Sequence, residues 1–317
     1  MAGRLAGLGS MLRLVARGLA ARDTDAEPLP DVPKRKPSVE REGLAVDARR
    51  LERYLAATAG DGVARLKGPE GVVSPVFPAV WETAQALELF AGLDRPLPGA
   101  GVVHVEGELV SLRPIAPDDR LRCRVELERA ERVRRGVRLT LTSRTWNAAG
   151  QLCTQSVAVF LAKTRKPAAD DAPKAAPRDD SAERPEEWEE VARWKLGAGA
   201  GRRYASVSGD YNPIHLWSWT ARPFGFGRPI LHGFCIEAMV AHALIEHRFD
   251  GQPTALRRLR IAFRAPLPLP STACLQVGES AGQRWFRVTD EAGAKVYAEG
   301  SYAGGVQTPR PKLRIVK

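Results

Sequence analysis

The feature of the sequence that most constrains its fold is an order of helix and strand signals that occurs twice. Each copy begins with one apolar helix candidate and continues with strand candidates. A proline-rich turn separates the first two strands of each copy, "RPIAPDD" in one and "APLPLPST" in the other. The repeat lies in the pattern and not in residue identity. It predicts two sheets, each wrapped round one central helix.

Apolar residues that alternate with polar ones indicate the strands. This alternation covers residues 120–128, 137–142 and 157–161 in the first copy, and 258–264, 273–277, 285–290 and 295–302 in the second. Period-two alternation is typical of antiparallel strands with one buried face. The helix candidates are residues 78–93 and 232–247, and the second is apolar nearly all round, which predicts a buried helix. The predicted fold class is α+β.

The segment 164–187 divides the chain into two comparable halves. It is rich in proline, alanine and charge and nearly free of large apolar residues, so it cannot form a core and is predicted to be a linker. The first repeat is then expected at 41–163 and the second at 188–317. Residues 1–40 form an extension that begins with an amphipathic basic helix, "MAGRLAGLGSMLRLVARGLAAR". This helix suits a transit peptide, a membrane-surface helix or, as we favour, a helix docked on its own protein.

Composition and charge exclude several classes of protein. The 317 residues are 44% hydrophobic and carry a net charge of +11, but no zinc-finger, RRM or KH signature accompanies the charge. We therefore expect a generally basic surface and no nucleic-acid partner. No apolar run is long enough to span a bilayer, and the four cysteines are scattered without paired spacing. A cytoplasmic, reducing location follows from this cysteine usage.

The stretch "GDYNPIH" at 209–215 places an acid, an amide and an imidazole close together. Asn212 followed by Pro213 is a helix-start signal, since Asn caps well and Pro fits the first helical position. His215 would then lie in the first helical turn, where the helix dipole favours its neutral form. With Asp210 in the same cleft, the pair could activate a water molecule. The alternative is that Asp210 and Asn212 only cap the helix and His215 is a surface residue.

A second candidate feature is "RPILHGFCIEAM", where a His-Gly pair opens the buried helix. Gly233 has no side chain, so a ligand oxygen can approach its N–H closely, and a free N–H at a helix start is a natural oxyanion donor. Gly233 could equally be a packing glycine. His232 could be structural or part of the site.

Residues 204–238 as a whole resemble the signature of the MaoC-like dehydratases, the (R)-specific enoyl-CoA hydratases. The resemblance is carried by Tyr204, Ser208, Gly209, Asp210, Asn212, Pro213, Ile214, His215, Ala221, Gly225, Phe226, Pro229, His232 and Gly233. It implies a double-hotdog fold in which the first repeat lacks the catalytic motif. The sequence departs from the family pattern at Trp217, where many members have an acidic residue, and at Phe234, where Met is usual. These two positions bear on acyl chain length.

The resemblance also implies an activity, namely reversible syn hydration of trans-2-enoyl thioesters to (R)-3-hydroxyacyl thioesters. Asp210 and His215 would activate the water, Asn212 would orient the pair and the Gly233 N–H would polarise the thioester carbonyl. The residues expected to bind substrate are Tyr204, Ser208, Arg222, Phe226, Arg228, Pro229, His232 and Arg264. The substrate would be carried on coenzyme A or acyl carrier protein, whose phosphates these arginines, with Arg258 and Arg260, could bind. A solvated basic face is the alternative for any single arginine. No metal and no further cofactor are expected.

Other readings of these residues fit less well. Cys235 lies in a helix predicted to be buried, so an inert thiol is favoured over a nucleophile. His232, His242 and His247 lack the spacing of a helical metal site. The competing functions are a non-catalytic module that binds acyl thioesters and, on the same fold, an acyl-CoA thioesterase. The chain is expected to act either as a homodimer or as a pseudo-dimeric monomer.

Overall fold

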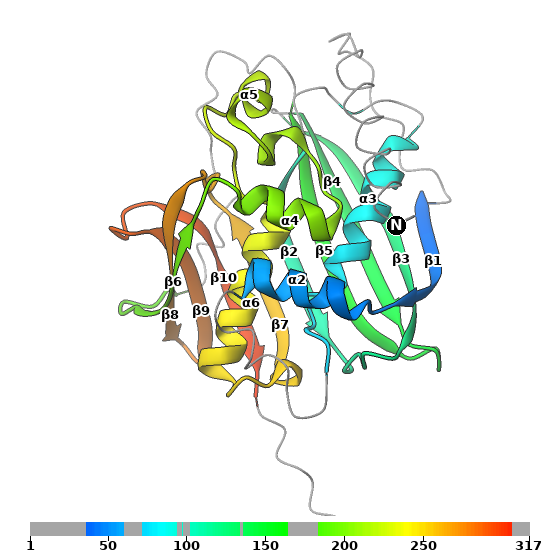
Figure 1. Cartoon of the computed structure of the whole chain (residues 1–317). Coiled ribbons are helices and arrows are strands. Elements are labelled where there is room, and N and C mark those ends of the chain that lie inside the picture. Colours follow the sequence, from blue (N-terminus) through cyan, green and yellow to red (C-terminus); the bar gives the residue numbers. More distant parts are fainter. Residues whose placement is uncertain are drawn as a thin grey trace, which may run out of the picture.

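The computed structural model describes residues 36–59, 72–93, 97, 102–133, 136–163 and 183–305. The amphipathic helix expected at the N-terminus and most of the expected linker lie outside these residues. In the part of the chain that is described, no helix combines the length and apolarity needed to cross a membrane. Figure 1 shows helices packed on the inner side of one long, curved sheet.

The first half contains five strands and two helices. They are β1 (Ser38–Ala45), α2 (Ala48–Thr58), α3 (Ala79–Ala91), β2 (Val102–Ser111), β3 (Arg120–Val133), β4 (Gly136–Trp146) and β5 (Leu152–Lys163). β1 pairs antiparallel with β3 from Ser38 onward, so the expected boundary after residue 40 cuts through a strand and the repeat begins earlier. The sequence pattern missed β1 and α2.

The second half repeats this arrangement with additional short helices. Its elements are β6 (Glu189–Leu196), α4 (Ala200–Ser208), η2 (Pro213–His215), α5 (Ser218–Ala221), η3 (Arg222–Phe224), α6 (Gly233–Arg248), η4 (Pro253–Ala255), β7 (Leu256–Phe263), β8 (Ser271–Ser280), β9 (Gln283–Asp290) and β10 (Val296–Gly304). The α+β prediction is confirmed, and both apolar helix candidates are helices. The helix expected after Asn212 is only the three-residue 3-10 turn η2.

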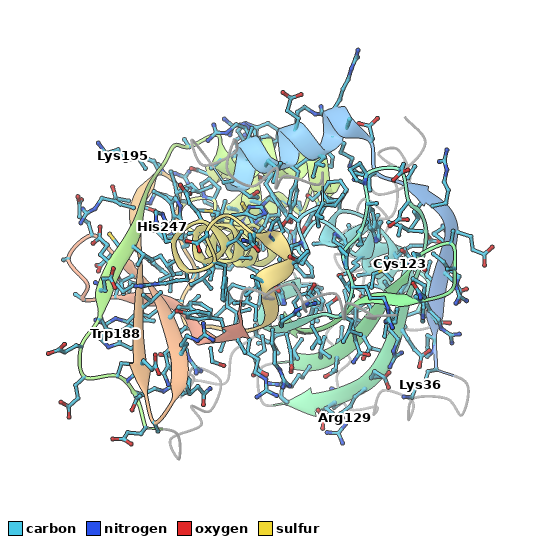
Figure 2. All side chains as sticks on the ribbon, turned by 90° about the horizontal axis from the view of Figure 1, so that it is seen from below. Lys36, Cys123, Arg129, Trp188, Lys195 and His247 are labelled. Atoms are coloured by element: carbon cyan, nitrogen blue, oxygen red, sulfur yellow. The ribbon has the colours of Figure 1, made fainter. Side chains whose placement is uncertain are left out.

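All ten strands form a single sheet, in the order β1-β3-β4-β5-β2-β7-β10-β9-β8-β6. Each half thus contributes five neighbouring strands, and the two sets follow the same order outward from the centre. The halves join through antiparallel pairing of β2 with β7, which aligns Leu109 with Leu259. Side chains alternate across the sheet, so that Cys123 and Val125 of β3 are buried while Arg122 and Arg124 are partly exposed. The alternation shifts at an irregularity between Leu127 and Arg129, and Arg129 is exposed; Figure 2 shows it at the outer margin.

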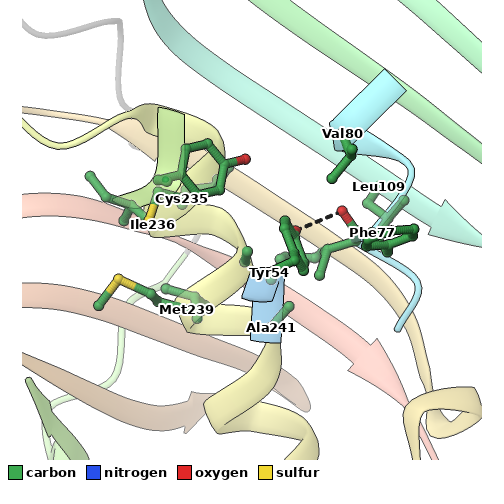
Figure 3. Packing of buried hydrophobic residues seen from close by; sticks show 14 of the residues in the cluster. Tyr54, Phe77, Val80, Leu109, Cys235, Ile236, Met239 and Ala241 are labelled. Carbon is green, nitrogen blue, oxygen red and sulfur yellow. Dashed lines mark hydrogen bonds between the residues drawn. The ribbon is translucent and has the colours of Figure 1, made fainter. Parts of the chain in front are cut away.

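One continuous hydrophobic cluster spans both halves. In Figure 3, Tyr54 of α2 lies between Phe77 and Leu109 of the first half on one side and Ile236 and Met239 of α6 on the other. The Tyr54 hydroxyl donates a 2.9 Å hydrogen bond to the Val76 carbonyl, which satisfies a polar group that is fully buried. The shared core and the shared sheet make the two halves one structural unit.

Candidate active site

The loop from Ser208 to His215 is shaped by hydrogen bonds of its own side chains. α4 ends at Gly209, whose φ of 82° places it in the left-handed region that favours glycine. The Ser208 hydroxyl donates to the Tyr204 carbonyl at 3.0 Å and accepts from the Asp210 N–H at 3.2 Å. Asp210 Oδ1 accepts from the Asn212 N–H at 3.1 Å. The carboxylate of Asp210 is therefore held at a defined place beside the turn.

Asn212 links this loop to the first half of the chain. Its Oδ1 accepts from the Ile214 N–H at 3.4 Å, which is the predicted capping contact. Its Nδ2 donates to the Val102 carbonyl of β2 at 3.2 Å. The side chain is 7% exposed, so both contacts are shielded from water. Asn212 thus fixes the loop against a strand that precedes it by more than a hundred residues.

His215 is buried and neutral. Its Nδ1 lies 2.8 Å from the Ile230 carbonyl, which can only accept, so Nδ1 carries the proton and Nε2 keeps a lone pair. Burial, followed by the neighbouring His232, lowers the pKa of His215 to about 3, against the opposing effect of Asp210. The prediction of a neutral imidazole is correct, but its reason was wrong. η2 is too short to supply a helix dipole, and burial has the largest effect.

His232 joins the two candidate features. Its Nε2 donates to the backbone carbonyl of Asp210 at 3.0 Å, and its ring stacks on His215 with centroids 3.7 Å apart. Burial lowers the pKa of His232 to about 4. Burial also raises the pKa of Asp210, whereas the adjacent His215 and the Asn212 N–H lower it. An acid and two neutral imidazoles thus share one small volume.

Gly233 is the first residue of α6. Within the described residues its N–H donates no hydrogen bond, as expected for the first turn of a helix. An added Cβ at this position would lie 2.7 Å from Cβ and 2.8 Å from Nδ1 of His104, on β2. The absence of a side chain is therefore required by packing against the first half. No pattern in the sequence indicates this contact.

A small pocket with a cavity volume of about 40 Å³ opens beside the loop. It is lined by Thr83, Ala86, Leu87, Phe90, Val102, Phe160, Asp210, Asn212 and Phe234. The first six belong to the first half, on α3, β2 and β5. Sequence patterns missed all six, because an apolar helix gives no sign of which residues face a cavity. The polar end of the pocket is Asp210 and Asn212, and the remainder is mainly apolar.

The other residues expected to bind substrate are not among those that line this pocket. Tyr204 is 1% exposed, its ring lies 5.0 Å from that of His232, and its hydroxyl has no partner among the described residues. Pro229 is buried, and its carbonyl accepts from the Leu269 N–H at 2.8 Å. Arg222 and Arg228 are exposed, and Phe226 is half-buried, on the segment that follows α5.

The expectation for three arginines of the sheet needs correction. Arg264 has an 8% exposed side chain and is paired with Glu299 at 2.8 Å, so its guanidinium is occupied within the fold. Arg258 and Arg260 both pair with Glu108 of β2. All three side chains thus form ion pairs across the strands.

Asp210, His215 and His232 each offer a ligand atom within 4.8 Å of the others, close enough to consider a metal ion. The two rings, however, are inclined by only 26° and stacked, so their in-plane lone pairs do not converge on one point. His242 lies elsewhere and is bonded to the Thr58 and Ser74 hydroxyls. The donor set suits hydrogen bonding to a small polar molecule better than metal coordination.

The chain matches known proteins over the region that holds this site. The MaoC like domain model matches residues 186–300, which include the whole loop and the start of α6. The 3-hydroxyacyl-thioester dehydratase X of Mycobacterium tuberculosis is 32% identical over 280 residues, which cover 87% of this chain and 90% of that protein. The chain belongs to the MaoC-like dehydratase family. Membership in this family makes it a hydro-lyase, as the resemblance of residues 204–238 implied.

Shorter and structural matches support the assignment to the MaoC-like dehydratases. The peroxisomal enoyl-CoA hydratase 2 of Arabidopsis thaliana is 43% identical over 57 residues, 18% of each chain. A crystal structure of HtdX from M. tuberculosis matches with a TM-score of 0.65 at 29% identity, over 84% of this chain and 99% of that one. A further M. tuberculosis protein, described as a double hotdog fold, matches with a TM-score of 0.53 at 14% identity, over 86% of this chain and 98% of that one. The expected double-hotdog fold is confirmed.

Proposed function

We propose that this MaoC-like dehydratase catalyses reversible hydration of trans-2-enoyl thioesters to (R)-3-hydroxyacyl thioesters in fatty-acid metabolism. The observation that supports it most is the arrangement of Asp210 and His215 beside a mainly apolar pocket. The Nδ1–Ile230 hydrogen bond leaves the His215 Nε2 lone pair free to accept a proton. A carboxylate oxygen of Asp210 and a ring nitrogen of His215 lie within 4.8 Å of each other, so the two side chains are close enough for one water to bond to both.

In the hydration direction, Asp210 and His215 hold the water and His215 Nε2 accepts one of its protons. The water oxygen forms a bond to C3 of the enoyl group, and the C2–C3 π electrons move toward the thioester carbonyl. The Gly233 N–H stabilises the enolate-like oxygen, an interaction worth ~3 kcal/mol of barrier in comparable sites. The proton then returns to C2, so that H and OH have added across the double bond. The (R) configuration is carried over from the family.

The acyl chain is expected to lie in the pocket lined by α3 and β5 of the first half. Leu87, Phe90 and Phe160 supply apolar surface there, and the side chain at Phe234 borders it from α6. The carrier would extend outward past the exposed segment that holds Arg222 and Arg228. Those two arginines are the proposed contacts for carrier phosphate, whether on coenzyme A or on acyl carrier protein.

The test is loss of the conjugated enoyl-thioester absorbance with crotonyl-CoA and with a longer enoyl-CoA. The wild type should remove this absorbance without releasing thiol, and Asp210→Asn and His215→Ala should each abolish the reaction. Asp118→Asn and His247→Ala change exposed residues of the same types and should stay active. Thiol release would identify a thioesterase instead. Binding without turnover, on both coenzyme A and carrier-protein substrates, would identify a non-catalytic module.

A further inference from the structure

The first half lacks the catalytic motif, yet one of its histidines touches the start of α6. His104 lies on β2, and three of its atoms, Cβ, Nδ1 and Cγ, come within 3.0 Å of the position that a Cβ on Gly233 would occupy. The contact is thus made against the backbone of the residue proposed to polarise the thioester carbonyl. Apart from the neighbours of Gly233 in the chain, no other side chain of the described residues comes as near to that point.

The ring of His104 is enclosed by aromatic side chains. Its centroid lies 5.0 Å from that of Phe160, 4.4 Å from Phe234 and 4.9 Å from Phe263. Phe160 and Phe234 also line the pocket, so His104 supports its wall from behind. A ring packed on three sides has little freedom to move, so the backbone of Gly233, which contacts it, is restrained as well.

The two ring nitrogens of His104 face different elements, Nδ1 the start of α6 and Nε2 the backbone of β2 at Gly107. Nδ1 lies 2.8 Å from the position that a Cβ on Gly233 would occupy. Nε2 lies 3.4 Å from the corresponding Cβ position at Gly107, and Glu237 Oε2 lies 3.0 Å from that same position. Gly233 and Glu237 are four residues apart and therefore share one face of α6. Both nitrogens and this carboxyl oxygen are buried, and none makes a hydrogen bond of standard geometry in the described chain, although the Glu106 backbone is near enough to His104 to oppose the lowering of its pKa by burial. Because unpaired buried polar atoms are costly, packing alone would favour an apolar residue at this position.

The same strand also holds the acid–base loop. Val102, two residues before His104, accepts the hydrogen bond from Asn212 Nδ2 at 3.2 Å. The two contacts come from positions two residues apart on β2, one through a backbone carbonyl and the other through a side chain. One strand of the first half therefore touches the loop that carries Asp210 and the helix that carries Gly233.

We propose that His104 is a positioning residue, which sets the first turn of α6 so that the Gly233 N–H is aimed at the thioester carbonyl. The inference rests on the proposed function, because it concerns the same oxyanion donor. It gives the first repeat a role in the chemistry as well as in the pocket. A displacement of about 1 Å at a reacting group can cost ~100-fold in rate, so a contact of this closeness is sufficient to matter.

The first experiment compares His104→Asn with His104→Ala. Asn keeps the equivalents of Cβ, Cγ and Nδ1, the three atoms that meet Gly233, whereas both variants lose the stacking on the three phenylalanines. We expect Ala to lower kcat at least ten-fold with KM within three-fold, and Asn to keep kcat within three-fold of wild type, although its melting temperature is no higher than that of Ala. Val103→Ala, on the opposite face of β2, is the matched control and should retain wild-type kcat. A kcat that simply follows the melting temperature, or an unchanged kcat in Ala, would overturn the proposal.

The second experiment is a double-mutant cycle that needs no activity. Gly233→Ala should lower the melting temperature because its methyl group meets His104. The same change made in a His104→Gly background should cost much less. Equal losses of melting temperature in both backgrounds would show that the contact with His104 does not restrain the position of Gly233. If the wild type lacks hydratase activity but the cycle shows this coupling, then the proposed function fails and the contact between the halves stands.

Discussion

The imidazole rings of His215 and His232 lie face to face, with 3.7 Å between their centroids. Each ring donates its one N–H to a backbone carbonyl, His215 to Ile230 and His232 to Asp210. Two stacked rings at this distance cannot both be protonated at low cost, and burial disfavours either charge. The pair therefore stays neutral well below the pH at which a free histidine becomes charged.

This neutrality predicts how activity depends on pH. The pKa of His215 is lowered to about 3 in the folded enzyme, whereas a free histidine titrates near 6.5. His215 acts as a base only when it is unprotonated. The pH below which kcat/KM falls is therefore lowered together with the pKa of His215. We expect kcat/KM to stay level from pH 8 to about pH 5.5, with the His215 ring-proton resonance unmoved over the same range. An inflection near 6.5 in either measurement contradicts a buried neutral base.

Replacing Asn212 by Ala should slow the reaction more than it weakens substrate binding. The change removes the bonds to Ile214 and to Val102, and each buried hydrogen bond is worth roughly 1 kcal/mol or more. We expect kcat to fall ~10- to 100-fold. Steady-state kinetics would check this, with Asn147→Ala in the exposed β4–β5 turn as a control of the same chemistry. An unchanged kcat would mean that the loop holds its shape without Asn212.

The pocket predicts selectivity for chain length. Ala86 lines it from α3, so Ala86→Phe should fill part of the space that an acyl chain would occupy. We expect kcat/KM to fall at least ~10-fold for a long enoyl thioester and to change little for the crotonyl substrate. Paired assays with both substrates on the same preparation provide the control. A uniform loss for both substrates would indicate that the acyl chain lies elsewhere.

Gly201 of α4 is closely packed against the candidate site. A Cβ there would overlap the backbone carbonyl oxygen of His215, whereas a Cβ on the nearby Gly197 would meet nothing within 4 Å. Gly201→Ala should therefore lower both the melting temperature and activity, because the methyl group must displace the η2 turn. Gly197→Ala is the matched control and should resemble wild type. Thermal unfolding and the absorbance assay measure the two effects, and an active, stable Gly201→Ala protein would refute the packing.

The raised pKa of Glu237 predicts that the protein loses stability in alkaline solution. Burial, and then the neighbouring Glu82, raises the pKa of Glu237 from 4.5 to about 8. The folded protein thus keeps a proton that the unfolded chain releases above pH 4.5, and stability falls as the pH rises from there through about 8. Glu237→Gln cannot ionise, so its melting temperature should drop less between pH 6 and pH 9 than that of wild type. Glu186→Gln, at an exposed position, should behave like wild type; the same drop in Glu237→Gln as in wild type would rule out this carboxyl.

Local patterns in the sequence were sufficient to predict most elements of the fold. The alternation of Leu121 and Cys123 with arginines indicates β3, because burial of one face of a strand leaves a period of two. The apolar run after Gly233 indicates α6, because a helix buried on all sides is apolar nearly all round. The Asn-Pro pair indicated a turn start, but periodicity could not show that the turn stops after three residues.

What could not be predicted depends on contacts between distant residues. His104 touches Gly233, Asn212 bonds to Val102, and Arg264 finds Glu299, and none of these pairs is close in sequence. Each depends on how β2, β7 and β10 are ordered in the sheet, which local patterns do not specify. The pocket on α3 was missed for the same reason, since an apolar residue facing a cavity looks like one facing the core.

The pairing of β2 with β7 has a consequence for attempts to isolate the second half. Residues 183–305 include the whole matched loop, so they look like a sufficient minimal enzyme. Cut from the rest, β7 would become an open edge with unpaired N–H and C=O groups, a template for aggregation. A second copy could cover that edge and yet would not supply His104 or the Val102 carbonyl.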